Sequence, residues 1–398
     1  MRAIPIRSVV TTARSDSGVI ANTSGTRILP DGRVLLNDAT RKRLLLFDTT
    51  LKRIIIIADT AGEGRNKFGD GGGGLLPFVG DSTAWVDRAS SALVVVDGAG
   101  RFSRAVAPIR AADAGYYSGI LNGVPGFDAK GGLLYRGALK WTLPSIAQGG
   151  PDLPDSIVTM PDSAPIVRAD FDRRMIDTIA YVHYELRMLR MVRSGERRGF
   201  QVAQHPLPGS DEWAYLADGT VAIVRSHDYH VDWYRADGTH LATPKMPFDW
   251  RRLSGEEKQA MVDSAQRSLD SAYAVQSRQL DSVNRSLVAQ GIRPQWKPWK
   301  PLVVTAGQVP DYVPPIRPGS PIHADQNGNL WVVPSTSAGA TGGGNLLDVI
   351  SRNGEIVERV QLPAGRQLQG FGPAGTIYMI VPGEAGGPRI ERARIIRP

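Results

Sequence analysis

Residues 26–59 read TRILPDGRVLLNDATRKRLLLFDTTLKRIIIIAD, and this stretch decides the fold. Three short apolar runs follow one another in it, and turns rich in Asp, Gly, Thr and Lys separate the runs. Short apolar runs bounded by such turn residues are typical of β-strands joined by tight hairpins. The stretch therefore predicts a small antiparallel meander.

The same rhythm recurs along the chain. LADGTVAIV at residues 216–224 matches LPDGRVLLN at residues 29–37, and the second of these units extends over residues 211–246. Four further units cover residues 80–107, 126–183, 323–362 and 370–395. One meander cannot bury both of its faces, whereas meanders arranged as blades in a closed ring can. We predict an all-β fold, a six-bladed β-propeller that forms a single domain over residues 1–398. Seven blades, or a pair of β-sandwiches, are the alternatives.

The two ends of the chain are expected to close the ring. The last unit supplies only three strands of its own, around Gln369, around Ile377 and around Ile390 to Ile395. The N-terminal segment AIPIRSVVTTA, residues 3–13, has the composition of a strand and can supply the fourth. We predict that the N-terminal and C-terminal strands pair in one blade.

The segment VLLNDATRKRLLLFDTTLK, residues 34–52, resembles the NHL-type repeat, in which an acidic turn precedes an Arg, three apolar residues, Phe and Asp. Over nearly its whole length the chain is similar to six-bladed propellers of the TolB/NHL/SMP-30-like superfamily, and in particular to a bacterial family of unassigned function. The resemblance implies blades and not a chemistry, because propellers of this group include lactonases, oxidoreductases and interaction scaffolds.

Charge and composition restrict the partners. The 398 residues carry 47 Lys and Arg against 39 Asp and Glu, a net charge of +8, but the Arg residues are scattered among acidic ones. No basic motif interleaved with aromatic residues occurs, so we predict no nucleic-acid partner. The chain has no Cys, which excludes disulfides and thiolate chemistry.

No stretch is long and apolar enough to span a membrane, and RIIIIAD at residues 53–59 has only the length of a strand. The N-terminus lacks the apolar core of a signal peptide. The chain is therefore either cytoplasmic or given without an export signal. We expect a periplasmic or cell-envelope protein, with the cytoplasm as the alternative.

Residues 253–291 break the repeat and predict a helical insertion between the fourth and fifth blades. Ser254 stands three residues before Glu257, the pattern of a capping box, and Gly291 marks the end of the helix. The helix either packs across the rim of the propeller or binds a partner. Residues 292–321 are rich in Pro and Trp and should run extended, with Trp296 and Trp299 as candidate partner-binding residues or as anchors onto the blades.

The glycine run GEGRNKFGDGGGGLLPFVGDS, residues 62–82, lacks the Lys and Ser/Thr of a phosphate-binding loop. We predict a loop between blades that lies near the mouth of the channel, and a second loop over residues 143–165.

The stretch RSHDYHVDWYRADGTH, residues 225–240, contains three of the six histidines. Alignment with residues 26–59 makes SHDY a hairpin turn and HVDWYR the following strand, which puts His230 and Asp232 on one face. The candidate ligand-binding residues are Arg225, His227, Asp228 and His230, for an anionic or metal ligand. In the alternative reading these side chains only satisfy the turn and the neighbouring strands.

No catalytic motif is recognisable, and we predict a non-enzymatic binding or scaffold propeller that presents its loops and helical insertion to a protein or a small ligand. No cofactor is expected. The alternative is a hydrolase or lactonase with calcium or zinc in the central channel, for which Asn37, Asp38, Asn122 and Asp128 are available as ligands.

Overall fold

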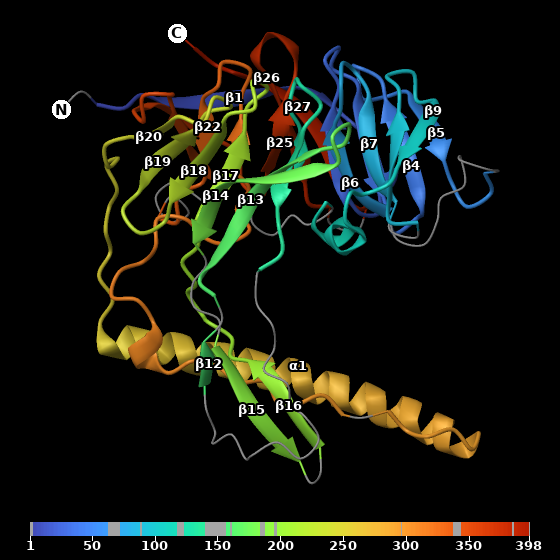
Figure 1. Cartoon of the computed structure of the whole chain (residues 1–398), viewed down its shortest axis with the longest axis vertical. Helices are drawn as coiled ribbons and strands as arrows, with labels where there is room; N and C mark the ends of the chain where they lie inside the picture. Colours follow the sequence, from blue (N-terminus) through green and yellow to red (C-terminus); the bar gives the residue numbers. More distant parts are fainter. Residues whose placement is uncertain are drawn as a thin grey trace.

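The structure is a computed structural model that describes residues 3–62, 72–87, 90–117, 123–139, 157–159, 161–183, 188–194, 197–295, 297–336, 344–383 and 386–397. Within these ranges the chain forms a β-propeller, with one long helix and a small sheet below the blades (Figure 1).

Four sheets of the ring contain four antiparallel strands each. The first is built from β2 (Gly25–Ile28), β3 (Val34–Asp38), β4 (Arg43–Phe47) and β5 (Ile54–Ala58). The second is built from β6 (Gly72–Pro77), β7 (Thr83–Asp87), β8 (Ala92–Val96) and β9 (Phe102–Val106). The third is built from β10 (Gly126–Phe127), β11 (Leu133–Arg136), β13 (Ser163–Asp170) and β14 (Met175–His183). The fourth is built from β17 (Glu212–Tyr215), β18 (Val221–Arg225), β19 (His230–Tyr234) and β20 (His240–Ala242).

The remaining two blades are joined into one eight-stranded sheet. The fifth consists of β21 (His323–Ala324), β22 (Leu330–Val332), β23 (Leu346–Ile350) and β24 (Ile356–Gln361). The sixth consists of β25 (Gln367–Phe371), β26 (Thr376–Val381), β27 (Arg389–Ile395) and β1 (Ile6–Arg14). β1 pairs antiparallel with β27, which confirms the predicted closure, and its first residues also pair in parallel with β24.

Alternation of side chains explains why the blades stack. In β3, Leu35 packs toward the second blade and Leu36 packs toward the sixth. In β18, Val221 and Ile223 face the third blade, whereas Ala222 and Val224 face the fifth. Since successive residues of a strand point to opposite faces, an unbroken apolar run is buried on both sides.

Six apolar clusters follow from this pattern, one at each junction between neighbouring blades, including the junction between the sixth and the first. The described blades therefore form a closed ring of six. A seventh cluster of Leu207, Leu253, Val304, Val309 and Val313 lies apart from the ring, next to the start of the long helix.

The helix α1 (Gly255–Ala289) follows β20 and precedes β21, as predicted. Its capping box is formed, because the Ser254 hydroxyl accepts from the Glu257 backbone N–H and the Glu257 carboxylate accepts from the Ser254 N–H. It is one uninterrupted helix of 35 residues with no fully buried residue. Gly291 lies just beyond it with a φ of +71°. No described helix is both long and apolar enough to cross a membrane.

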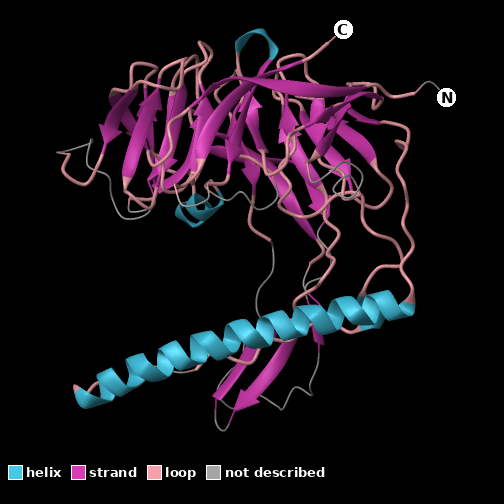
Figure 2. Ribbon diagram, turned by 180° about the vertical axis from the view of Figure 1, so that it is seen from behind, coloured by secondary structure: helices cyan, strands magenta, loops and turns pink. Residues whose placement is uncertain are grey.

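Figures 1 and 2 show α1 below the ring, separated from the blades and beside the sheet of β12 (Ile157–Thr159), β15 (Met188–Ser194) and β16 (Arg197–Val202). The helix therefore does not pack across the propeller rim. The Pro-rich segment after it runs back along the helix, where the Tyr273 hydroxyl donates to the Pro298 carbonyl and the Asn284 amide donates to the Gln295 carbonyl.

The glycine-run prediction is partly wrong. Residues 63–71 lie outside the described residues, but Gly72–Pro77 form β6, the innermost strand of the second blade. At Gly73 a Cβ atom would lie 2.5 Å from the Val86 carbonyl oxygen, so the glycine is needed for the close approach of β7 and not for a loop. Of the second predicted loop, residues 157–159 and 163–165 belong to strands.

Candidate functional site

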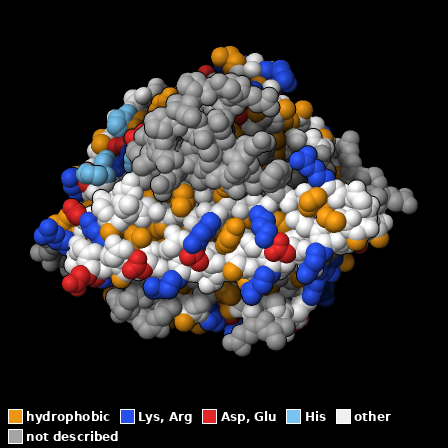
Figure 3. All heavy atoms as spheres, turned by 90° about the horizontal axis from the view of Figure 1, so that it is seen from below, with side chains coloured by type: hydrophobic (Ala, Val, Ile, Leu, Met, Phe, Trp, Pro, Cys, Tyr) orange, Lys and Arg blue, Asp and Glu red, His pale blue; other side chains and the backbone are white. Residues whose placement is uncertain are grey.

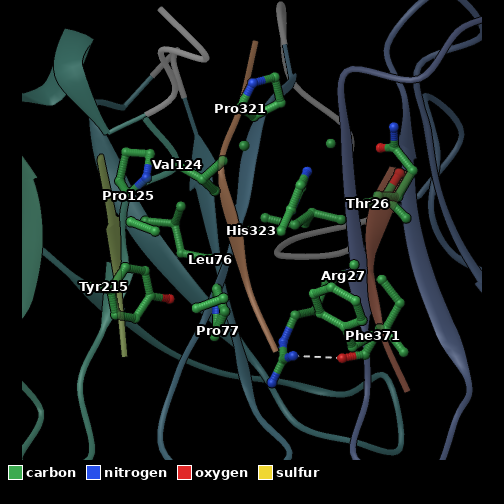
Figure 4. Close-up of a pocket in the computed structure, with 18 of the residues that line it drawn as sticks. Thr26, Arg27, Leu76, Pro77, Val124, Pro125, Tyr215, Pro321, His323 and Phe371 are labelled. Carbon is green, nitrogen blue, oxygen red and sulfur yellow. Dashed lines mark hydrogen bonds between the residues drawn. The ribbon is translucent and has the colours of Figure 1, made fainter. Parts of the chain in front are cut away.

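The innermost strand of every blade faces a common cavity on the propeller axis. Its lining residues come from β2, β6, β10, β17, β21 and β25 and from the segments next to them. The cavity has a volume of about 870 Å³, which is within the usual size range of small-molecule sites. Apolar surface makes up more of its wall than polar surface. Figure 4 shows Leu76, Pro77, Val124, Pro125, Pro321 and Phe371 around the cavity, with Arg27, Tyr215 and His323 among them.

Arg27 is the cationic side chain of this wall. Its Nη1 donates to the neighbouring Ile28 carbonyl at 2.5 Å, and its buried Nε has no hydrogen-bond partner among the described residues. Burial lowers the pKa of the guanidinium, which nevertheless stays charged because arginine does not lose its proton in proteins. The Arg27 guanidinium is therefore a cation with an unsatisfied hydrogen-bond donor, its Nε–H, among the described residues.

Neither of the two carboxylates of the cavity wall forms a described ion pair with Arg27. Asp128 lies 2.8 Å from the Arg168 guanidinium and accepts from the Gly132 N–H. Asp325 accepts from the Asn327 and Asn329 backbone N–H groups of its own turn. Both carboxylates are therefore held by groups other than Arg27, although Asp128 Oδ2, which lies close to the Arg168 guanidinium, has no described hydrogen bond.

His323 enters the cavity from β21 of the fifth blade. Burial lowers the pKa of its imidazole to about 4, and a hydrogen bond with the Leu368 backbone opposes this shift. Because that hydrogen bond favours the protonated ring, the ring nitrogen donates and the Leu368 carbonyl accepts. The buried Nε2 has no described partner. At neutral pH the ring is uncharged, and its unprotonated nitrogen can only accept a hydrogen bond.

Tyr215 on β17 packs closely against Gly126 of the third blade, and Trp213 of the same strand packs against Gly123. A Cβ atom at Gly126 would lie 1.7 Å from the Tyr215 hydroxyl oxygen, and one at Gly123 would lie 2.1 Å from the Trp213 Nε1. Only glycine fits at both positions. Burial raises the pKa of the Tyr215 hydroxyl, so it stays protonated at neutral pH.

A buried carboxyl group lies next to the cavity lining. Glu212 is the first residue of β17 and is 0% exposed. Its Oε1 accepts from the Gly319 N–H at 2.8 Å, a hydrogen bond with the Gly123 backbone is also present, and Oε2 has no described partner. Burial raises the pKa of Glu212 to about 8. This group therefore links the fourth blade to segments of the third and the fifth.

The predicted ligand-binding residues lie on the β18–β19 hairpin and are absent from the cavity lining. Arg225 spans two carboxylates, at 2.7 Å from Asp211 and 2.6 Å from Asp232. It also donates to the Tyr181 carbonyl and to the Tyr234 hydroxyl. Its hydrogen-bonding capacity is largely used within the blade.

The other three predicted ligand-binding residues do not all lie together. His230 Nδ1 lies 2.5 Å from Asp228, and its Nε2 lies 3.4 Å from Asp232, on the shared face that the sequence predicted. His240 also reaches Asp232, at 3.1 Å. His227 is exposed in the turn. The structure thus brings Arg225, Asp228 and His230 into one chain of ion pairs and leaves His227 outside it; a ligand at these residues stays a prediction.

The candidate partner-binding residues lie only partly within the described ranges. Trp296 lies outside the described residues, and Trp299 is half-buried in the segment that returns along α1. Of the four residues suggested as metal ligands, Asn122 is likewise outside the described ranges. The Asn37 amide donates to the Gly73 carbonyl, and Asp38 accepts from the Ala21 and Asn22 N–H groups. Among the described residues, no group of three or more His, Asp or Glu side chains is arranged to hold a metal ion.

Sequence reasoning missed Arg27, Tyr215 and His323 as site residues. All three share one signal: each lies on the innermost strand, just before the Asp-containing turn that opens a repeat unit, in TRILPDG, AYLADG and HADQNG. In a propeller that strand faces the axis, so its residues are the natural candidates for the channel wall.

Comparison with known proteins gives distant similarity to solved structures and no activity. No protein-family model matches the chain, and no curated protein matches it. Among solved structures, a member of the DUF4221 family from Bacteroides vulgatus is similar at 10% identity and a TM-score of 0.48, over 98% of each chain. Virginiamycin B lyase from Staphylococcus aureus is similar at 10% identity and a TM-score of 0.41, over 98% of this chain and 99% of that one. The PQQ-bound aldose sugar dehydrogenase from Streptomyces coelicolor gives 12% identity and a TM-score of 0.41, over 99% and 100%. Likeness at this level says nothing about function, and what the chain's own blades establish is an all-β propeller.

Proposed function

We propose that the protein is a non-enzymatic binding propeller whose central channel takes a small ligand. The observation that carries the proposal is the set of buried polar atoms without a described hydrogen-bond partner on residues that line one cavity: Thr26 Oγ1, Arg27 Nε, Tyr117 Oη, Asp128 Oδ2 and His323 Nε2. Buried polar atoms in folded proteins nearly always have a hydrogen-bond partner. A bound molecule that fills the cavity would supply these partners.

The same proposal covers the superfamily, the localisation and the role of α1. It places the chain with propellers of the TolB/NHL/SMP-30-like superfamily, in the periplasm or cell envelope, with α1 and its returning segment available to a protein partner. Support comes from the ring of six blades and from the position of α1 outside it. Calcium or zinc in the channel, which the hydrolase alternative requires, is checked by metal analysis of the purified protein.

Filling the cavity tests the channel proposal. Thr26→Trp adds an indole to the wall, Thr26→Val keeps the size of the side chain, and Ser268→Trp places the same indole on the exposed side of α1. We expect a library of small organic molecules to include compounds that raise the melting temperature of the parent, Thr26→Val and Ser268→Trp proteins. A ligand that binds only the folded state at 100 times its Kd stabilises that state by about 2.7 kcal/mol.

The same compounds should leave Thr26→Trp unchanged, provided that its circular dichroism matches that of the parent. A library without any stabilising compound, or shifts that persist in Thr26→Trp, would show that the channel is not a ligand site.

A further inference from the structure

We propose that the ligand of the channel is an organic anion with an apolar body and a hydrogen-bond donor, such as a hydroxyl or an amide N–H. This inference rests on the proposed function and adds the chemical class of the ligand. It stands on Arg27 and His323, which reach the cavity from β2 and β21, on either side of the sixth blade.

The preference for an anion follows from the position of Arg27 in the wall. Arg27 has a neighbouring carbonyl as its hydrogen-bond acceptor and a buried Nε that no described residue satisfies. The carboxylates of Asp128 and Asp325 are held by Arg168 and by a turn. A partly buried guanidinium without a counter-ion is costly, and its donors match a carboxylate or a phosphate. The cavity therefore favours a ligand that brings one negative charge to Arg27.

The need for a hydrogen-bond donor on the ligand follows from the tautomer of His323. Because Nε2 is the nitrogen without a described partner, we assign Nδ1 as the donor in the hydrogen bond with the Leu368 backbone. A neutral imidazole with a protonated Nδ1 has only an acceptor at Nε2. A ligand atom at this position must donate, and a second carboxylate there would be repelled by the lone pair.

The need for an apolar body in the ligand follows from the surface between Arg27 and His323. Phe371 of β25 lies between Arg27 and His323 around the ring, and Leu76 and Pro77 come from β6, the strand next to β2 on the other side of Arg27 (Figure 4). These side chains have no hydrogen-bonding group to offer. A hydrophobic or aromatic core, with its charge at one end and its donor away from it, matches this wall.

Isothermal titration calorimetry with four related probes tests the class. Hydroxynaphthoate carries both the charge and the donor, hydroxynaphthamide lacks the charge, methoxynaphthoate lacks the hydroxyl donor, and hydroxynaphthyl phosphate replaces the carboxylate by a phosphate. We expect hydroxynaphthoate to bind at least about tenfold more tightly than the amide and than the methoxy compound, as loss of a charged or buried hydrogen bond predicts. The phosphate probe tells whether Arg27 prefers one type of anion.

Three variants assign the effects to residues. Arg27→Gln should abolish the preference for hydroxynaphthoate over its amide, and Arg27→Lys, which keeps the charge, should retain part of it. His323→Phe should weaken hydroxynaphthoate about tenfold and leave methoxynaphthoate unchanged. The Thr26→Trp variant should bind none of the probes.

Equal binding of hydroxynaphthoate and its amide, an unchanged preference in Arg27→Gln, or no binding of any probe would overturn the ligand class. In those cases compounds from the library that bind the parent protein and not Thr26→Trp would still support the channel function. If Thr26→Trp binds every compound as the parent does, the channel function fails as well.

Discussion

At the scale of single residues, the hairpin that the sequence singled out as a candidate ligand site is a network of ion pairs. Arg225 is held between Asp211 and Asp232, whose side chains are 3% and 9% exposed. Removing one partner from such an arrangement leaves buried charges uncompensated. This points to a stabilising role for Arg225, which an unfolding experiment can separate from a binding role.

We expect Arg225→Ala to lower the free energy of unfolding by about 3–5 kcal/mol, measured by urea denaturation. Arg235→Ala, in the exposed turn after β19, is the matched control and should change stability by less than about 0.5 kcal/mol. A stable Arg225→Ala protein would contradict the structural role and would return this hairpin to the candidates for a ligand site.

Glu212 predicts a pH dependence. Its pKa is about 8 in the folded protein against an ordinary value of 4.5, so the folded state holds the proton more tightly than the unfolded state. The stability from this group is fully present below about pH 4.5 and is lost as the pH rises toward and through about 8. Arg136 and Asp211 are the charged groups that act on it, with opposite signs.

We expect Glu212→Gln to gain stability relative to the parent protein as the pH rises over this interval, by an amount on the order of a few kcal/mol. Chemical denaturation at several pH values measures the difference, and Glu256→Gln on the exposed first turn of α1 is the control. A constant difference between the parent protein and Glu212→Gln at all pH values would show that Glu212 does not titrate in this range.

The residues of the candidate site are also the feature that the sequence predicted least well. Arg27 was part of the stretch that decided the fold, and the Asp-containing turn of TRILPDG marks its strand as the innermost one, but the sequence does not show which side chains of that strand face the cavity. That distinction arises only when six innermost strands close around one cavity. The burial that leaves His323 neutral is likewise produced by neighbouring blades far away in the sequence.

At the scale of elements, local sequence predicted well. The capping box of Ser254 and Glu257 and the stop at Gly291 gave the limits of α1, because these contacts lie within a few residues. The position of α1 could not be read in the same way. Figure 3 shows acidic and basic side chains interspersed with a few apolar ones on the side of α1 that points away from the ring.

Since no residue of α1 is fully buried, its caps should matter more than in a buried helix. We expect Ser254→Ala to lower the stability of the helix by about 1 kcal/mol, seen as about fivefold faster hydrogen exchange in its first turns. Exchange in the blades should not change, and Ser268→Ala in the middle of α1 provides the control. Equal acceleration in α1 and the blades would mean that the helix and the ring unfold together.

At the scale of the whole molecule, closure of the ring depends on β1, the first strand of the chain, which pairs with strands near the C-terminus. β1 lies between β24 and β27, and its pairing joins the fifth and sixth blades into one sheet. The sequence allowed this closure to be predicted because the last repeat unit was one strand short. The cluster between the sixth and first blades depends on the same closure.

A single backbone substitution in β1 tests whether this closure holds the ring together. Val9 pairs with Ile395 of β27 and packs against the cluster between the fifth and sixth blades. Proline at this position cannot donate a backbone hydrogen bond and disturbs a strand that has neighbours on both sides, so we expect Val9→Pro to cost about 3 kcal/mol or more. Val9→Ala removes most of the side chain and keeps the backbone N–H, and it should cost less, about 1–2 kcal/mol. Thermal and urea unfolding of the two variants separate the backbone from the side chain: similar losses in both would mean that β1 contributes only packing, whereas a much larger loss in Val9→Pro identifies strand pairing as the contact that closes the ring.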